Sequence, residues 1–237
     1  MTICQESIHL ERVRQIQAIA CDYSGVLFND RSLALDAVND TLKHFGFPRL
    51  NLPEFRNDFR LPYYSLFTQK GIDVESAKSV CIRKYRERYS KQRLSLGPFD
   101  DTRFAIKTLT DWGLKLAVAS QTPRFQLDDQ LIGYDLHWYF SSILACGDVS
   151  EEKPSPLPLL ETARRIGVKP ENMAYVGDMY EDIQCARNAG VTSVALARPE
   201  GSYHTRNRLM EGRPDLVIAS LTELVVLLAS SQMRAII

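Results

Sequence analysis

Short apolar runs recur along the chain, and each is followed by residues typical of turns and then by a helical pattern. Six such runs lie around residues 17–23, 114–120, 141–148, 173–178, 192–197 and 215–220. Three segments between them carry apolar residues at helical spacing and reach a glycine at the end, the usual stop of a helix: residues 100–113, 156–168 and 180–190. Strands that alternate with helices pair in parallel, within a sheet covered on both faces. The pattern therefore predicts an α/β fold with a Rossmann-like three-layer core, in which the carboxyl ends of the strands share one ligand-binding edge.

One long interval interrupts this alternation directly after the first apolar run. Residues 31–96 carry a helical pattern throughout. An insertion of that length and position predicts a helical cap domain over residues 31–96, which forms a lid above the sheet edge. The α/β core then comprises residues 1–30 and 97–237. The apolar C-terminal run "LVVLLASSQMRAII" is either a last helix packed on the sheet or part of a subunit contact, so the sequence leaves monomer and homodimer open.

Composition limits the partners that the protein is expected to have. With 29 basic and 29 acidic residues, the 237-residue chain has no net charge to recruit nucleic acid or an anionic membrane, and we expect neither as a partner. A hydrophobic content of 45% is ordinary for a soluble globular protein. No apolar stretch approaches the roughly 18 residues that span a bilayer. The N-terminus has charges of both signs and no apolar signal-peptide core, so we expect a cytoplasmic protein.

Cysteine and histidine spacing gives no sign of a zinc or redox site. The five cysteines form no Cys-x-x-Cys pair, and we expect all of them to be reduced and structural: Cys4, Cys21, Cys81, Cys146 and Cys185. The four histidines have no metal-ligand spacing, and we expect structural or surface roles for His44, His137 and His204. The basic run "RKYRERYSKQR" includes an apolar stripe and a glutamate, which favours a solvated helix over a nucleic-acid surface.

Carboxylates follow two of the predicted strands at the point where each strand ends. Asp22 follows the first apolar run, and Asp178 follows "AYVG", with Asp182 four residues later. Asp22 is suited to attack phosphorus and form a phosphoaspartate. A carboxylate that approaches a phosphate dianion is repelled, so we expect Mg²⁺ between them, held by Asp22 and Asp178. Asp182 lies one helical turn beyond Asp178, where it binds a metal-bound water or orients a neighbouring lysine.

A hydroxyl and an ammonium group complete the set at this edge. Ser120 follows the second strand and Lys153 lies in the loop after the third. We expect Ser120, the adjoining Gln121 and Lys153 to hold the phosphate oxygens that carry charge in the transition state. Gly25 is expected to let backbone N–H groups approach the phosphate closely. Because Thr122 and Pro123 suit the N-cap and first position of a helix, Ser120 alternatively only ends its strand.

Four short segments in this order resemble the four motifs of the haloacid dehalogenase superfamily. They are "DYSGV", "VASQTP", "KPSPLPLL" and "GDMYED", and they match its phosphatase-like members with a small helical cap after the first motif. The resemblance covers nearly the whole chain. It implies that Asp22 is the nucleophile, that Asp178 and the backbone carbonyl of Ser24 bind Mg²⁺, and that Ser120 and Lys153 bind phosphate.

The first motif departs from the family pattern at Ser24. Phosphatases of the superfamily carry an aspartate two residues after the nucleophile, where it acts as general acid and then as general base. A serine hydroxyl has no pKa near neutral, and loss of an acid–base group usually costs about 10² to 10⁴ in rate. At this position the ATPase branch of the superfamily has Thr, the phosphonate-cleaving branch has Ala and the dehalogenase branch has Tyr. The dehalogenase branch fits poorly, because the tyrosine of this chain, Tyr23, lies one position too early. Ser24 is thus a serviceable replacement, a brake on the rate, or a mark of lost activity.

The predicted cap offers two interpretations of its aromatic and basic residues. In "LPEFRNDFRL" the predicted helix places Arg56 and Arg60 on one face and Phe55 and Phe59 on another. They are either core aromatics and solvated arginines, or a source of substrate contacts. In the second case one of four side chains reaches down to the leaving group: Arg56, Arg60, Tyr63 or Tyr64.

Taken together, the residues and the resemblance predict a Mg²⁺-dependent phosphohydrolase that acts on a small phosphorylated metabolite through Asp22. Because Ser24 is a poor acid, we expect a leaving group that needs little protonation, or a proton relay supplied by the cap or the substrate. Two alternatives remain: a phosphotransferase with a long-lived phosphoenzyme, and a phosphate-binding regulatory protein with impaired catalysis. A response-regulator receiver domain would be about half this length and would have no cap.

Overall fold

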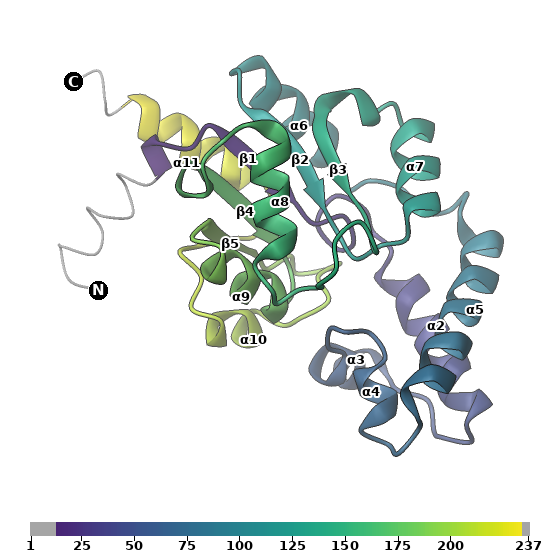
Figure 1. Ribbon diagram of the computed structural model, residues 1–237. Coiled ribbons are helices and arrows are strands. Elements are labelled where there is room, and N and C mark those ends of the chain that lie inside the picture. Colours follow the sequence, from purple (N-terminus) through teal and green to yellow (C-terminus); the bar gives the residue numbers. More distant parts are fainter. Residues whose placement is uncertain (1–12, 234–237) are drawn as a thin grey trace.

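A single parallel sheet forms the centre of the molecule in the computed structural model, which describes residues 13–233 (Figure 1). Its strands are β1 (Ala18–Cys21), β2 (Lys115–Ala119), β3 (Phe140–Leu144), β4 (Met173–Gly177), β5 (Thr192–Leu196) and β6 (Leu216–Ile218). The strands lie in the order β3-β2-β1-β4-β5-β6, and every neighbouring pair is parallel. This confirms the predicted α/β class, and all six apolar runs form strands. Because β1 lies between β2 and β4, the residues that follow these three strands meet at one edge.

Helices cover both faces of the sheet. The core helices are α6 (Thr102–Asp111), α7 (Arg124–Gly133), α8 (Leu157–Ile166), α9 (Tyr180–Asn188), α10 (Arg206–Glu211) and α11 (Leu221–Met233), with short 3₁₀ turns at His137–Tyr139 and Pro170–Asn172. One apolar cluster joins α6, α7 and α11 to the sheet, and a second joins α8 and α9 to its opposite face. Leu224 and Leu228 of α11 belong to the first cluster. The described part of the C-terminal run thus forms a last helix packed on the core, which is one of the two alternatives expected.

The residues of β1 show why the chain forms this layered core. Successive side chains of a strand point to opposite faces. Ile19 and Cys21 accordingly pack in the cluster with α6 and α11, whereas Ala18 and Ala20 pack in the cluster with α8 and α9. Burial of both faces explains why the strand is apolar at every position.

Residues 31–96 form a group of helices beside the carboxyl edge of the sheet, at the lower right in Figure 1. The helices are α2 (Arg31–His44), α3 (Leu52–Asp58), α4 (Ser65–Thr68) and α5 (Val74–Gln92). Side chains from all four helices share an apolar cluster, which includes Leu42, Phe55, Phe67 and Cys81. We call this group the helical segment; its assignment as a separate cap domain stays a prediction.

The structure corrects the prediction of a continuous helix over residues 52–61. α3 ends at Asp58, and Phe59 has an extended backbone with φ −65° and ψ 133°. Arg56 and Arg60 therefore do not share a helix face as predicted. The chain must leave the helix here because Leu61 precedes Pro62, and a residue before proline avoids the α conformation.

Several further expectations can be compared with the structure. Cys21, Cys81, Cys146 and Cys185 are free thiols, as predicted. Cys4 and the N-terminal segment, for which we expect a reduced thiol and no secretory signal, lie outside the described residues. Within residues 13–233, no helix is long and apolar enough to span a membrane.

Candidate active site

Asp22 lies directly after β1 at the centre of the carboxyl edge. Its backbone N–H donates to the Val176 carbonyl over 2.9 Å, which extends the pairing of β1 with β4 by one residue. Its side-chain Oδ1 accepts the Tyr23 N–H at 2.7 Å. Two backbone contacts thus fix a buried carboxylate whose second oxygen remains for other partners.

Lys153 is the partner of that second oxygen. Its Nζ lies 3.0 Å from Asp22 Oδ2 and 2.7 Å from Asp182 Oδ1, and it donates to the Tyr175 hydroxyl at 3.0 Å. The side chain is buried. Burial opposes the charged form, but Asp182 and Asp22 outweigh it and hold the pKa of the Lys153 ammonium above its usual value. A permanent cation therefore lies against the predicted nucleophile.

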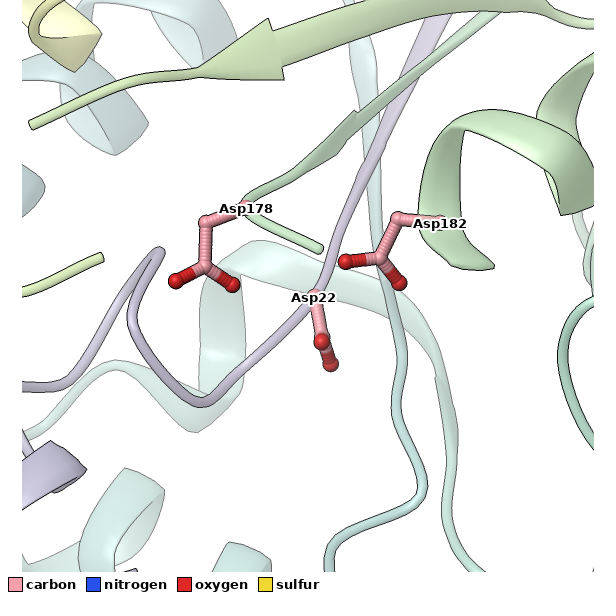
Figure 2. Close-up of side chains that lie close together, drawn as sticks. All are labelled: Asp22, Asp178 and Asp182. Carbon is pink, nitrogen blue, oxygen red and sulfur yellow. The ribbon is translucent and has the colours of Figure 1, made fainter. Parts of the chain in front are cut away.

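Asp22, Asp178 and Asp182 are close neighbours (Figure 2), with a carboxylate oxygen from each within 4.8 Å of the others. Burial, and then Asp182, raise the pKa of the Asp178 carboxyl well above its ordinary value. Its Oδ2 accepts the Tyr203 N–H at 2.5 Å, but its Oδ1 is buried without a hydrogen-bond partner among the described residues. Clustered carboxylates with an unpaired oxygen fit a divalent cation that prefers oxygen ligands, as Mg²⁺ does.

Asp182 is already engaged by the protein. Its Oδ1 accepts from Lys153, and its Oδ2 accepts the Met179 N–H at 3.0 Å at the start of α9. Of the two predicted roles, this geometry supports the orientation of Lys153. Direct contact of Asp182 with a metal stays a prediction.

The structure shows a steric reason for the glycine at position 25. Its own N–H donates to the Phe28 carbonyl at 2.9 Å, and it does not line the cavity described below, so closer approach of other N–H groups to a phosphate stays a prediction. Two observations explain why a glycine is needed here. Its φ is +72°, and a Cβ at this position would lie 2.1 Å from Asp178 Oδ2. Gly25 thus allows the turn after β1 to approach Asp178.

Three hydroxyl groups form a short chain beside Asp22. Ser24 Oγ lies 3.0 Å from Thr122 Oγ1, and Ser120 Oγ donates to the same atom at 3.1 Å. Thr122 does not cap a helix as predicted, because α7 begins at Arg124 with Pro123 as its N-cap. Both polar atoms of the Gln121 side-chain amide are buried, and neither has a hydrogen-bond partner within residues 13–233. Thr122 was missed as a site residue because its sequence context is that of a helix cap.

Asp30 is the most informative residue that the sequence pattern did not reveal. The tight turn at residues 24–28 brings this fully buried carboxyl back to Ser24, whose Oγ donates to Asp30 Oδ2 at 2.8 Å. Tyr203 donates to the other oxygen at 3.2 Å. Burial raises the pKa of Asp30 to about 6, although both hydrogen bonds oppose the shift. Asp30 occupies the N-cap position of α2 without a side-chain capping bond.

Five of the ten predicted site residues line one cavity of about 450 Å³, namely Asp22, Ser24, Ser120, Gln121 and Lys153, whereas Asp178 and Asp182 do not line it. Arg56 and Arg60, predicted to contact substrate, do not line it. Arg56 instead donates to the His204 carbonyl at 3.0 Å, and Arg60 lies at a separate hollow beside α4. The early end of α3 explains why the two arginines point elsewhere. Of the two tyrosines considered, Tyr63 lines the cavity and Tyr64 does not.

His204 joins the core to the helical segment. Its Nδ1 accepts the Tyr180 N–H at 2.9 Å, so Nε2 carries the proton and donates to the Phe59 carbonyl at 2.9 Å. The ring is fully buried, which agrees with the structural role expected for it. Burial, reinforced by Arg60, lowers the pKa of His204 to about 4.

The buried neutral ring predicts a loss of stability in mild acid. The unfolded chain binds a proton at His204 below about pH 6.5, whereas the folded chain does so only near pH 4. Stability is therefore lost as the pH falls through this window, and between pH 7 and pH 5 His204 alone costs about 2 kcal/mol. Urea unfolding at both pH values measures this effect. His204→Gln should lose about that much less than wild type, whereas exposed His44→Gln should lose as much as wild type; equal losses in all three contradict the prediction.

With the geometry established, the chain can be compared with known proteins. A model of the haloacid dehalogenase-like hydrolase family matches residues 19–196. The chain belongs to this family. It is 28% identical over 219 residues to a phosphoglycolate phosphatase from Neisseria meningitidis, which covers 90% of this chain and 93% of the relative. A phosphoglycolate phosphatase from Escherichia coli is 32% identical over 156 residues, which are 65% of this chain and only 61% of that relative.

A solved structure shows the same fold. The crystal structure of a hydrolase from Pseudomonas syringae superposes with a TM-score of 0.78 at 19% identity, over 90% of this chain and 98% of that protein. The resemblance seen in the sequence is thus confirmed at the level of family and fold. The assignment of Asp22, Lys153 and Asp178 to the catalytic positions of the family stays a prediction.

Proposed function

We propose that the protein is a Mg²⁺-dependent phosphohydrolase that forms a phosphoaspartyl intermediate on Asp22. The observation that carries this proposal is the contact of Asp22 with the buried ammonium of Lys153 at the floor of the cavity, beside Asp178. Phosphatase relatives support it. Because these relatives are phosphoglycolate phosphatases, phosphoglycolate is the first substrate to assay.

The residues divide the first chemical step among them. Asp22 Oδ attacks phosphorus in line, an O–P bond forms, and the bond from phosphorus to the alcohol oxygen breaks. Ser120, Gln121 and Lys153 hold the oxygens of the transferring group, and the unpartnered amide of Gln121 suits this task. Mg²⁺, when held by Asp22, Asp178 and the Ser24 carbonyl, supplies positive charge that reduces repulsion between carboxylate and phosphate.

The proton that the alcohol needs comes from the Ser24–Asp30 pair. Ser24 lines the cavity, and its hydroxyl is hydrogen-bonded to Asp30 behind it. When Asp30 is protonated, its O–H donates to Ser24 Oγ, the reverse of the bond in the structure, and the leaving alcohol then takes the proton of Ser24 while Ser24 takes the proton of Asp30. In the second step water attacks the phosphoaspartate and returns a proton to the pair by the same path. This internal pair takes the place of a relay through the cap or the substrate. A pKa of about 6 at Asp30 suits both the donation of a proton in the first step and its return in the second.

Phosphate release with and without metal tests the proposal. Wild-type protein should release inorganic phosphate from small phosphate esters in the presence of Mg²⁺, and excess EDTA should remove the activity. An acid-quenched time course should show a burst when hydrolysis of the phosphoenzyme is slow. A product that appears only with an added alcohol acceptor indicates a phosphotransferase. Ligand binding without any release indicates a protein with impaired catalysis, and activity that resists EDTA contradicts the metal assignment.

A further inference from the structure

The part of the cavity above Asp22 is lined by apolar side chains of the helical segment. α2 contributes Ala34, Ala37 and Val38, the chain after α3 contributes Phe59 and Leu61, and α5 contributes Ile82. Phe125 of α7 and Met179 extend this lining on the core side. A phosphate held at Asp22 would thus direct its organic part against hydrocarbon.

Polar atoms among the lining residues are largely occupied within the protein. The Tyr85 hydroxyl donates to Gln126 Oε1 at 2.7 Å, and the Tyr203 hydroxyl donates to Asp30. Burial raises the pKa of the Cys81 thiol to about 12, which keeps it neutral. Apart from the hydroxyl of Tyr63, which lines the cavity without a hydrogen bond among the described residues, little hydrogen-bonding capacity therefore remains for a polar organic group.

Two of the three cations at the cavity are already paired with carboxylates. Lys153 is held between two carboxylates at the phosphate end. Arg124 forms ion pairs with Asp128 and Asp148. Arg86 is exposed and lines the cavity without an ion pair among the described residues, with its guanidinium 5.6 Å from the centre of the Phe125 ring. A carboxylate in the apolar part, away from Arg86, would lose its hydration without gaining a partner, which is costly.

We propose that this site takes the monophosphate of an uncharged, largely apolar alcohol, rather than a phosphorylated hydroxy acid such as phosphoglycolate. The proposal rests on the function proposed above and names the substrate class of that site. Size agrees with it, because a cavity of about 450 Å³ equals the volume of roughly 15 molecules of liquid water. A two-carbon acid would leave most of that space unfilled.

Binding of unreactive phosphonates tests the substrate class without turnover. The probes are hexylphosphonate, propylphosphonate and 3-phosphonopropionate, titrated calorimetrically into wild-type protein with Mg²⁺. Each buried methylene is worth about a fourfold change in affinity, so hexylphosphonate should bind up to about 60-fold more tightly than propylphosphonate. The added carboxylate should make 3-phosphonopropionate the weakest of the three.

Two residues of α5 with equal exposure supply a matched pair of variants. Ile82 and Val74 are both 41% exposed, but only Ile82 lines the cavity. Ile82→Asn should weaken hexylphosphonate binding about fivefold or more and leave propylphosphonate within twofold. Val74→Asn should change neither. Arg86→Leu should leave hexylphosphonate binding equal or tighter.

The outcomes separate this inference from the proposed activity. Equal affinity for hexyl- and propylphosphonate, or tightest binding of 3-phosphonopropionate with its loss in Arg86→Leu, overturns the apolar substrate class. Hydrolysis of hexyl phosphate is measured in parallel. If hexylphosphonate binds as expected but no phosphate is released, the substrate-binding inference stands and the phosphohydrolase proposal fails.

Discussion

Replacement of Asp22 by asparagine should reduce phosphate release by about 10⁴ to 10⁶, the range expected when a covalent nucleophile is removed. An amide oxygen is a far weaker nucleophile than a carboxylate. The Tyr23 N–H donates to one carboxylate oxygen of Asp22, and Lys153 contacts the other. Asparagine retains one of these two oxygens. The change thus removes the reacting group and keeps most of the local structure.

Trapping of the phosphoenzyme makes this test specific. Acid quench of wild type with labelled substrate should leave label on the protein, and Asp22→Asn should retain none. Asp111→Asn is the matched control, because it is the same isosteric change at an exposed ion pair with Lys107. It should keep wild-type rates. Label that persists on Asp22→Asn would identify a different nucleophile.

The fold could be predicted because its signals are local and repeated. Each strand is short, apolar and followed by a helix of clear periodicity, and parallel topology then places the strand ends together. Asp22, Ser120 and Asp178 follow three neighbouring strands, so their convergence needed no knowledge of side-chain positions. Lys153 lies in the loop after the third predicted strand, and this position alone predicted that it reaches the same edge.

Residues that depend on loop conformation could not be predicted in the same way. Asp30 reaches Ser24 only because the turn at Gly25 reverses the chain, and nothing in the spacing of the two residues shows this. Tyr203 comes from the segment after β5, yet it donates to both Asp178 and Asp30. The prediction for Arg56 and Arg60 was wrong because the helix expected to carry both of them ends before Arg60.

The site contains carboxyl groups whose burial lowers the stability of the folded protein. Asp178 and Asp30 both have raised pKa values, chiefly because they are buried. At neutral pH such carboxylates lower stability relative to the unfolded chain, where they ionise freely. Retention of Asp30 in a fully buried position, with no capping bond to α2, is therefore better explained by its contact with Ser24 than by a gain in stability.

An exchange of the two residues, Ser24→Asp with Asp30→Ser, should raise the turnover number on the order of 10²-fold. The exchange keeps one carboxyl and one hydroxyl within hydrogen-bond distance, but it places the carboxyl at the cavity wall, where it protonates the alcohol directly. Asp30→Asn should instead lower turnover about tenfold or more, because Ser24 then has no group with which to exchange its proton. Ser24→Asp alone places two buried carboxyls together, which share one proton and raise one pKa further.

Steady-state rates and burst amplitudes of these variants, compared over pH 5 to 8, measure the role of the pair. Tyr203→Phe is the control, since it removes one hydrogen bond to Asp30 and keeps those from Ser24 and Gln126. Because the Tyr203 hydrogen bond lowers the pKa of Asp30, this variant should keep the limb near pH 6 and move it to higher pH, whereas Asp30→Asn should lose the limb. If the exchange leaves turnover unchanged and Asp30→Asn matches Tyr203→Phe, then Asp30 only positions Ser24, and the departing alcohol must leave without a proton from the protein.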